Sequence, residues 1–387
     1  MTSAIIITLC LLLLLAYIFD ISSSRTNIPS VLLLLLLGWG VNQVTKVIGI
    51  HIPDLTPVLP ALGSIGLILI VLEGTLDLKL DKSKYKFIFK SFVFALSPML
   101  ILSFILAFAF YYFGNIPYKY GLINAIPLSI ISSAIAISSI KNLKTSDKEF
   151  ITYESSLSDI LGIIFFNFLI LNEVINISSV GYFLLDIIII LIISFIAIIG
   201  LALLLSKIKH HVKFLPIILI IILVYYFAEI FHLPALIVIL LFGLFLANLD
   251  ELKHFDFFLR FNTETLEKEI VKFKDLTSEM TFLIRTMFFL LFGFLIETKE
   301  LLNLSSLLWA IVITVLIFGL RALHLYLLKL PLKPLFYIAP RGLITILLFL
   351  SIPASQGCIF INKSLIIQVI ILSAFVMMIG LINNKKD

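Results

Sequence analysis

The sequence predicts an all-α polytopic membrane protein with about thirteen transmembrane helices, and composition is the first reason. Of the 387 residues, 61% are hydrophobic and only 13% are charged, whereas soluble domains carry about 45–50% apolar and about 25% charged residues. Apolar runs of about 20 residues, long enough to cross a bilayer, recur from Ile5 to Ile382. This composition excludes a soluble enzyme. The chain also has no glycine-rich nucleotide-binding loop, so we do not expect ATP to drive its activity. No cofactor is expected.

Polar loops divide the chain into the individual predicted spans. The weakest separation lies at Phe231–Pro234, and merging the two segments there would lower the count to twelve. Ile5–Ala16 also resembles a signal-peptide core, but Met1–Ala4 carries no lysine or arginine, so we expect a retained first helix. The predicted spans cover residues 4–20, 28–45, 57–78, 88–113, 118–140, 150–171, 180–205, 214–231, 233–249, 279–297, 303–328, 334–355 and 364–383.

The distribution of loop charge supports this count and orients the chain. With the N-terminus outside, the cytoplasmic loops and the C-terminal tail hold 21 of the 28 lysines and arginines, and the outer loops hold four. Cytoplasmic loops of membrane proteins carry this excess. We therefore expect a multi-pass protein of the cell membrane with a cytoplasmic C-terminus. The mild excess of basic residues follows from topology, so no nucleic-acid partner is expected.

Three arginines remain after the loop cations are counted, and the acids within predicted spans include two deep ones, with Glu73 and Asp77 nearer an inner helix end. The three arginines and the two deep acids are Arg285, Arg321, Arg341, Glu154 and Asp159. Ionisable groups at this depth cost several kcal/mol and are functional candidates by default. Asp159 lies 11 residues beyond the cytoplasmic Lys148, so at about 1.5 Å per residue it lies ~16 Å into the membrane, close to the middle of the bilayer.

The chemistry expected of Asp159 follows from its burial. Burial disfavours a charged carboxylate, so the group holds either a proton or a cation. Such a site would exchange one for the other, and the Ser158 hydroxyl would add an oxygen ligand. The alternative is that Asp159 only pairs with an arginine. For Glu154 and Arg321 we expect a structural ion pair, whereas Arg285 suits either role.

Two predicted spans are interrupted by proline, glycine or serine, seven spans apart. The first reads Ile123 to Ser129 and then Ser132-Ser133, and the second contains Pro340-Arg341-Gly342 and then Ser351 to Ser355. Paired interruptions predict two inverted repeats whose discontinuous helices cross at the ion site. The chain is then one membrane domain, residues 1–387. Its parts are a first half over 1–178, a linker helix over 180–205, a second half over 214–383 and a cytoplasmic connector over 250–278.

The run Glu154-Ser155-Ser156-Leu157-Ser158-Asp159 resembles the Glu-Ser-Leu-Leu-Asn-Asp signature of the monovalent cation:proton antiporter superfamily, the sodium/hydrogen exchanger type. The resemblance covers nearly the whole chain and includes, in order, residues 72–77, 242–248, 288–293 and 340–342. It implies a homodimer that exchanges Na⁺ or K⁺ for protons by alternating access. Asp159 would carry the ions, Glu154 would pair with Arg321, and Arg341 would lie at the second helix break.

Two departures from the family pattern concern the expected ion and proton site, which comprises Asp159, Ser158, Ser132 and Ser133. Ser158 replaces the family's asparagine, and Ser132-Ser133-Ala134 stands where the family has Thr-Asp-Pro. A single carboxylate at the site suggests one-for-one exchange. Two other functions are also considered: an anion carrier that uses the arginines, and a membrane sensor that has lost transport. Cys10 and Cys358 are isolated, so neither a disulfide nor a resident metal site is expected.

Overall fold

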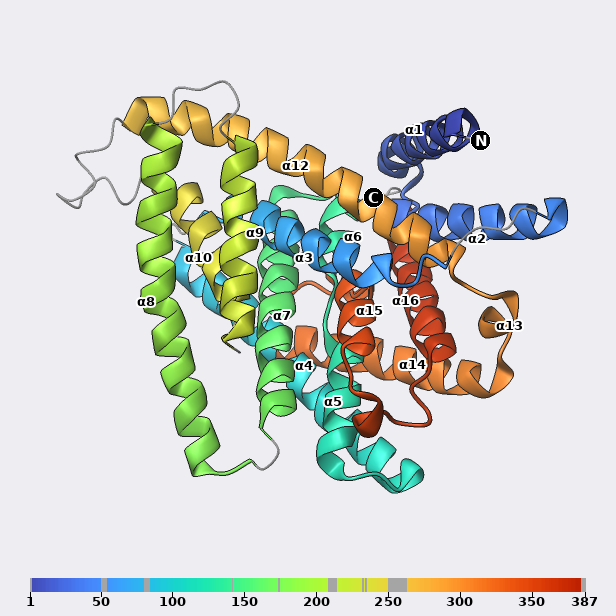
Figure 1. The fold of residues 1–387 in the computed structure, drawn as a ribbon. Coiled ribbons are helices and arrows are strands. Elements are labelled where there is room, and N and C mark those ends of the chain that lie inside the picture. The colour runs from blue at the N-terminus through green and yellow to red at the C-terminus, as the bar shows by residue number, and fades with distance from the viewer. Residues whose placement is uncertain are drawn as a thin grey trace. The chain divides into compact units, whose positions relative to one another are not determined.

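In the computed structural model, every regular element among the described residues is a helix or a helical turn. The described residues are 2–49, 54–79, 84–140, 142–172, 175–207, 214–231, 233, 235–249 and 263–383. Figure 1 shows the elements. The helices are α1 Thr2–Thr26, α2 Ser30–Ile48, α3 Val58–Leu76, α4 Tyr85–Gly114, α5 Tyr118–Ser129, α6 Ser133–Ser139, α7 Thr145–Leu171, α8 Ile177–Lys207, α9 Phe214–Ile230, α10 Leu236–Ala247, α12 Thr263–Phe294, α13 Thr298–Leu301, α14 Leu304–Leu327, α15 Leu343–Leu350 and α16 Lys363–Asn383, with 3₁₀ turns η3 Leu335–Tyr337 and η4 Ala354–Gln356.

Every predicted span coincides with helical structure. Among the described residues, nine helical segments are long and apolar enough to cross a membrane, counting α5 and α6 together. Three shorter apolar helices, Ile7–Ser23, Phe214–Ile230 and Leu236–Ala247, match the first, eighth and ninth predicted spans. The remaining predicted span, 334–355, holds η3, α15 and η4.

The predicted connector, residues 250–278, is described only in part. Residues 250–262 lie outside the described residues. The helix expected around residues 265–274 is the first part of α12, which continues without interruption into the tenth predicted span.

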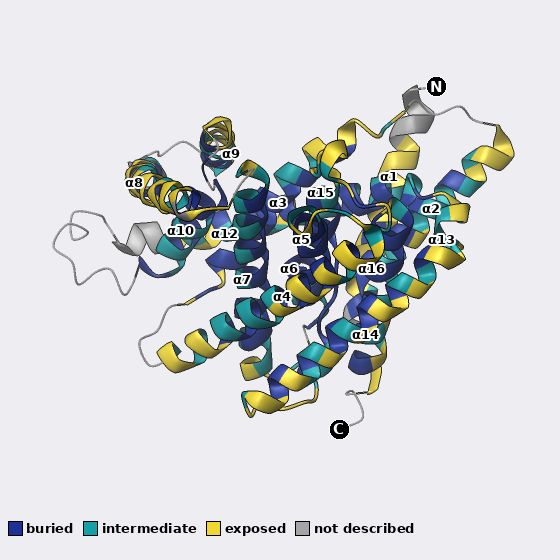
Figure 2. Cartoon of the chain, turned by 90° about the horizontal axis from the view of Figure 1, so that it is seen from below, coloured by how far each residue is buried: buried dark blue, intermediate teal, exposed yellow. Residues whose placement is uncertain are grey.

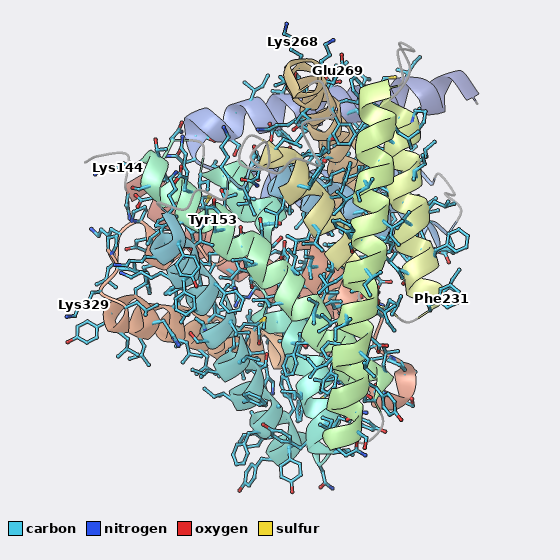
Figure 3. The ribbon with its side chains drawn as sticks, turned by 90° about the vertical axis from the view of Figure 1, so that its left-hand side faces the viewer. Lys144, Tyr153, Phe231, Lys268, Glu269 and Lys329 are labelled. Atoms are coloured by element: carbon cyan, nitrogen blue, oxygen red, sulfur yellow. The ribbon has the colours of Figure 1, made fainter. Side chains whose placement is uncertain are left out.

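The chain forms two compact units by contacts between its residues. Unit 1 comprises Met1–Ser64, Phe89–Gly162 and Leu283–Asp387, and unit 2 comprises Ile65–Ile88 and Ile163–Phe282. Figure 3 labels Lys144 and Lys329, which are exposed at the surface of unit 1. All residues of the predicted ion site belong to unit 1.

Unit 2 is organised around the packing of α8 against α10 and α9. Its core includes Ile190 of α8, Ala228 of α9 and Val238 of α10. Figure 2 shows α8 largely in the colour of exposed residues, and the large side chains that it exposes are apolar, among them Leu184 and Phe195. A helix with this apolar exposed face suits contact with lipid.

Close helix packing in unit 1 depends on glycines where α2 meets α12. A Cβ on Gly38 would collide with the Leu290 carbonyl oxygen, and a Cβ on Gly293 would collide with the Leu35 carbonyl oxygen. Small residues at such crossings let backbones approach closely in membrane proteins. The Asn42 side-chain amide donates to the Phe294 carbonyl oxygen over 2.5 Å, which fixes this crossing further.

Both predicted helix interruptions are present, but they differ in form. In the first, α5 ends at Ser129 and α6 begins at Ser133, and residues 121–136 are buried without interruption. In the second, a single 3₁₀ turn and the extended stretch 338–342 precede α15. The nearby Pro331, Pro334 and Pro340 explain this difference, because each proline lacks a backbone N–H and restricts the residue before it. The two discontinuous segments cross and pack together through α5 and α15 (Figure 1).

Candidate functional site

The gap between α5 and α6 leaves three consecutive backbone N–H groups without helical partners. Ile131 N donates to Ser158 Oγ over 3.0 Å, and Ser133 N donates to Asp159 Oδ2 over 3.3 Å. Between them, Ser132 N donates to the carbonyl oxygen of Pro340 over 2.9 Å. Buried backbone donors need such partners. The first helix break is therefore stabilised by acceptors from two adjacent side chains of α7, Ser158 and Asp159, and from the second helix break.

Asp159 is the central carboxylate of this arrangement, and its side chain is almost fully buried, with 1% of its surface exposed. Its Oδ2 atom accepts from the hydroxyl of Ser133 as well as from the Ser133 backbone. Its Oδ1 atom has no hydrogen-bond partner in the described part of the chain. No described lysine or arginine forms an ion pair with Asp159.

Ser132 lies at the same break and faces the second one. Its Oγ atom is buried and has no hydrogen-bond partner among the described residues. A Cβ on Gly342 would lie 2.7 Å from that oxygen, so the glycine is what allows the two breaks to meet here. Ser132, Ser133, Ser158 and Asp159, which were selected together from the sequence, therefore lie at one crossing.

Arg341 occupies the second break and satisfies carbonyl groups that the first break leaves free. Its Nε atom donates to the Leu128 carbonyl oxygen over 2.7 Å, and its Nη2 atom donates to the Ser129 carbonyl oxygen over 3.3 Å. Its Nη1 atom donates to the Ala339 carbonyl oxygen over 2.8 Å. These acceptors include the last carbonyls of α5, where a helix dipole carries partial negative charge. The buried guanidinium is therefore hydrogen-bonded by backbone carbonyl oxygens, and it forms no ion pair with a described acid.

Glu154 and Arg321 form a bidentate ion pair one and a half turns along α7 from Asp159. The two nitrogen–oxygen distances are 2.5 and 3.0 Å, and the side chains are 1% and 3% exposed. Arg321 also donates from Nε to the Leu335 carbonyl oxygen over 2.6 Å and lies over the ring of Phe94. The pair joins α7, α14 and η3, and α4 covers it.

A small cavity lies beside the crossing, next to α4. It is lined by Ser158, Arg321, Arg341, Ser129 and apolar residues of α4 and α14, and its volume is about 20 Å³. That volume holds about one water molecule. Asp159 does not line this cavity.

Arg285, for which the sequence left two roles open, does not contact Asp159. Its Nη1 atom donates to the carbonyl oxygen of Ala134 in α6 over 3.4 Å, and its Nη2 atom lies 3.9 Å from Oδ1 of Asp20 in α1. The sequence places Ala134 in the first break but does not single out Asp20. No sequence signal connects Asp20 or Arg285 to the break, because the connection depends on how α1, α6 and α12 pack.

The described residues contain no group of three or more His, Cys, Asp and Glu side chains arranged to hold a metal ion. What the crossing offers a ligand is a set of oxygens: the Asp159 carboxylate and the hydroxyls of Ser132 and Ser133. Carboxylate and hydroxyl oxygens suit hard cations. The arrangement can therefore hold either a proton or a small cation.

Comparison with known proteins agrees with the sequence resemblance. The family model described as "Sodium/hydrogen exchanger, transmembrane" matches residues 10–382. Two solved structures of the sodium proton antiporter MjNhaP1 from Methanocaldococcus jannaschii are similar in fold. The structure at pH 8 has a TM-score of 0.68 and 20% identity, covering 97% of this chain and 95% of that one. The electron-microscopy structure has a TM-score of 0.71 and 21% identity, covering 100% and 96%. No curated protein matches the chain by sequence.

Proposed function

The chain belongs to the transmembrane sodium/hydrogen exchanger family, a family of transporters, and is a multi-pass membrane protein. On that premise we propose that it exchanges a monovalent cation for a proton, one for one, at Asp159. The cation is Na⁺ or K⁺, with Na⁺ favoured by the family. The driving force is an ion gradient.

The observation that carries this proposal is the state of the Asp159 carboxylate. It is buried at a crossing of two broken helices, has no ion pair, and keeps one oxygen without a hydrogen-bond partner in the described part of the chain. A buried acceptor left in this way is costly, and buried charges require pairing. A proton or a cation on that oxygen removes the cost. Because both bind the same carboxylate, each excludes the other.

The supporting oxygens are those of Ser132 and Ser133. Ser133 already donates to Asp159, and its hydroxyl can rotate to present a lone pair when a cation replaces the proton. The Ser132 hydroxyl is buried beside it on the same break. Ser158 instead serves the backbone of Ile131, so we assign it a positioning role at the site.

The contacts of the arginines favour a cation substrate over an anion. Arg321 is paired with Glu154, Arg341 is bound to three carbonyl oxygens, and Arg285 lies between Asp20 and Ala134. An anion carrier would need at least one of these cations directed at the substrate. All three already have protein acceptors.

Alternating access completes the proposed cycle. The site would open in turn to each side of the membrane, and Asp159 would cross between these states only when loaded with a proton or a cation. We further propose that the protein is a homodimer, which the family resemblance implies. In the cell membrane its N-terminus lies outside and its C-terminus lies in the cytoplasm, because the positively charged loops then face the cytoplasm.

Proton flux in sealed proteoliposomes tests the proposal. A pH-sensitive dye reports dequenching when Na⁺, Li⁺ or K⁺ is added to vesicles with an established proton gradient. The antiporter gives cation-dependent dequenching, and the most effective ion is the substrate. Folded protein without flux under any cation gradient would support the sensor, and uptake of a labelled anion without cation-dependent flux would support the anion carrier.

A further inference from the structure

Arg285 connects three helices of unit 1 at the first turn of α6. Its guanidinium donates to the Ala134 carbonyl oxygen over 3.4 Å and approaches Asp20 of α1 to 3.9 Å. Asp20 in turn accepts from the Ser30 hydroxyl at the start of α2, over 3.4 Å. The arginine is mostly buried, with 13% of its side chain exposed. Its contacts therefore tie α6 to α12, α1 and, through Asp20, α2.

The residue that Arg285 holds is adjacent in sequence to a residue of the candidate site. Ala134 follows Ser133, whose backbone and hydroxyl both bind Asp159. α6 has only seven residues and begins directly after an extended stretch. Such a short helix has few internal hydrogen bonds, so contacts from neighbouring helices set the position of its first turn.

We propose that Arg285 is a positioning residue for the ion site: with Asp20 as its anchor, it fixes the first turn of α6 and thereby the Ser133 hydroxyl against Asp159. The inference rests on the proposed antiport function for its consequence, but its structural part stands on the contacts alone. Through the described contacts, Arg285 is connected to the ion site by way of Ala134 and Ser133.

Two effects of removing Arg285 have opposite signs. If the arginine positions α6, its loss misplaces Ser133 and weakens cation binding. If it acted only through its charge, its loss would remove a repulsion and strengthen cation binding. The sign of the change in cation KM therefore separates the two roles.

The chain offers a matched control in Lys363. Its Nζ atom also binds one carbonyl oxygen, that of Leu295 at 2.6 Å, and one carboxylate, that of Glu300 at 3.2 Å. Lys363→Gln removes the same kinds of contact elsewhere in unit 1 and does not touch α6. General destabilisation would affect both variants in the same way.

The test compares Arg285→Gln, Asp20→Asn and Lys363→Gln with the unmodified chain in proteoliposomes and in detergent. Arg285→Gln and Asp20→Asn each weaken the contacts that hold α6, at a cost of about one charge-assisted hydrogen bond. We expect both variants to raise the cation KM by roughly three- to tenfold with little change in maximal rate, and Lys363→Gln to leave KM unchanged. An unchanged or lowered KM in Arg285→Gln, or an equal rise in Lys363→Gln, would overturn the proposal.

Hydrogen–deuterium exchange tests the positioning itself without any transport. Amides of α6 should exchange faster in Arg285→Gln than in the unmodified chain, and Lys363→Gln should leave them unchanged. Equal exchange in all three proteins would overturn the positioning role. A chain without flux whose α6 still loosens in Arg285→Gln would contradict only the antiport function.

Discussion

Ser133 gives both its backbone N–H and its hydroxyl to a single oxygen of Asp159, and the other Asp159 oxygen has no hydrogen-bond partner among the described residues. Oδ2 therefore has a structural role, because it accepts the hydrogen bond of a backbone N–H at the helix break. Oδ1 remains able to bind a proton or a cation. This division explains how a buried aspartate can both hold the break and exchange its ligand.

Ser133→Ala tests the first half of that division. The ionised carboxylate loses one donor, so the proton is held more firmly and the cation KM at a given pH should rise on the order of tenfold. The measurement is the cation dependence of proton flux. Ser156→Ala is the control, because the Ser156 hydroxyl is buried on the same helix as Asp159 but has no hydrogen-bond partner in the described chain. A shift of equal size in both variants would argue against a specific role for Ser133.

Ser158 should matter through the backbone of Ile131. Ser158→Ala leaves that buried N–H without its acceptor, which costs about 1–3 kcal/mol, so the variant should unfold at lower temperature. Ser158→Asn introduces the family's residue and retains a carbonyl acceptor, so its Tm should fall less. Thermal unfolding in detergent measures both. Equal Tm values for the alanine and asparagine variants would show that the Ile131 hydrogen bond is not what the serine provides.

Breaking the Glu154–Arg321 pair should destabilise the fold. Glu154→Gln leaves a buried guanidinium without its counter-charge, and such losses cost about 3–5 kcal/mol. We expect a lower Tm, and the double variant Glu154→Gln with Arg321→Met should recover part of it because no buried charge is left. A double variant less stable than the single one would contradict a mainly structural role for the pair.

Competition at Asp159 predicts the pH dependence of transport. At lower pH the proton occupies the carboxylate more of the time, so the apparent cation KM should rise as pH falls, by at most about tenfold per pH unit. At higher pH the KM should level off once the carboxylate is ionised. Flux measured over a series of cation concentrations at each pH gives the curve. A cation KM independent of pH would mean that the two ions do not share a group.

The sequence was sufficient to predict the helical spans and the gathering of charged residues, because both follow from the cost of polar groups in a bilayer. Apolar segments form helices because the backbone polar groups must be hydrogen-bonded within the bilayer, and buried charges such as Glu154 and Arg321 are stabilised only when they pair. The two broken helices were visible as paired interruptions by proline, glycine and serine.

Other features depend on contacts that no local pattern contains. The first break falls at Ile130–Ser132, whereas Pro127 lies within α5, because the break is held by Ser158, Pro340 and Asp159 from elsewhere in the chain. The absence of an ion pair for Arg341 among the described residues has a similar explanation. Arg341 binds backbone carbonyls, which composition cannot reveal.

The central claim is that Asp159 carries the exchanged ions, and Asp159→Asn in the proteoliposome assay tests it most directly. Asparagine keeps the shape of the side chain and an acceptor for Ser133 but cannot exchange a proton for a cation. The account predicts a folded protein with no cation-dependent dequenching, whereas Asp54→Asn, in an exposed loop, retains the flux of the unmodified chain. Cation-dependent flux that persists in Asp159→Asn would contradict the account and place the exchanging group elsewhere.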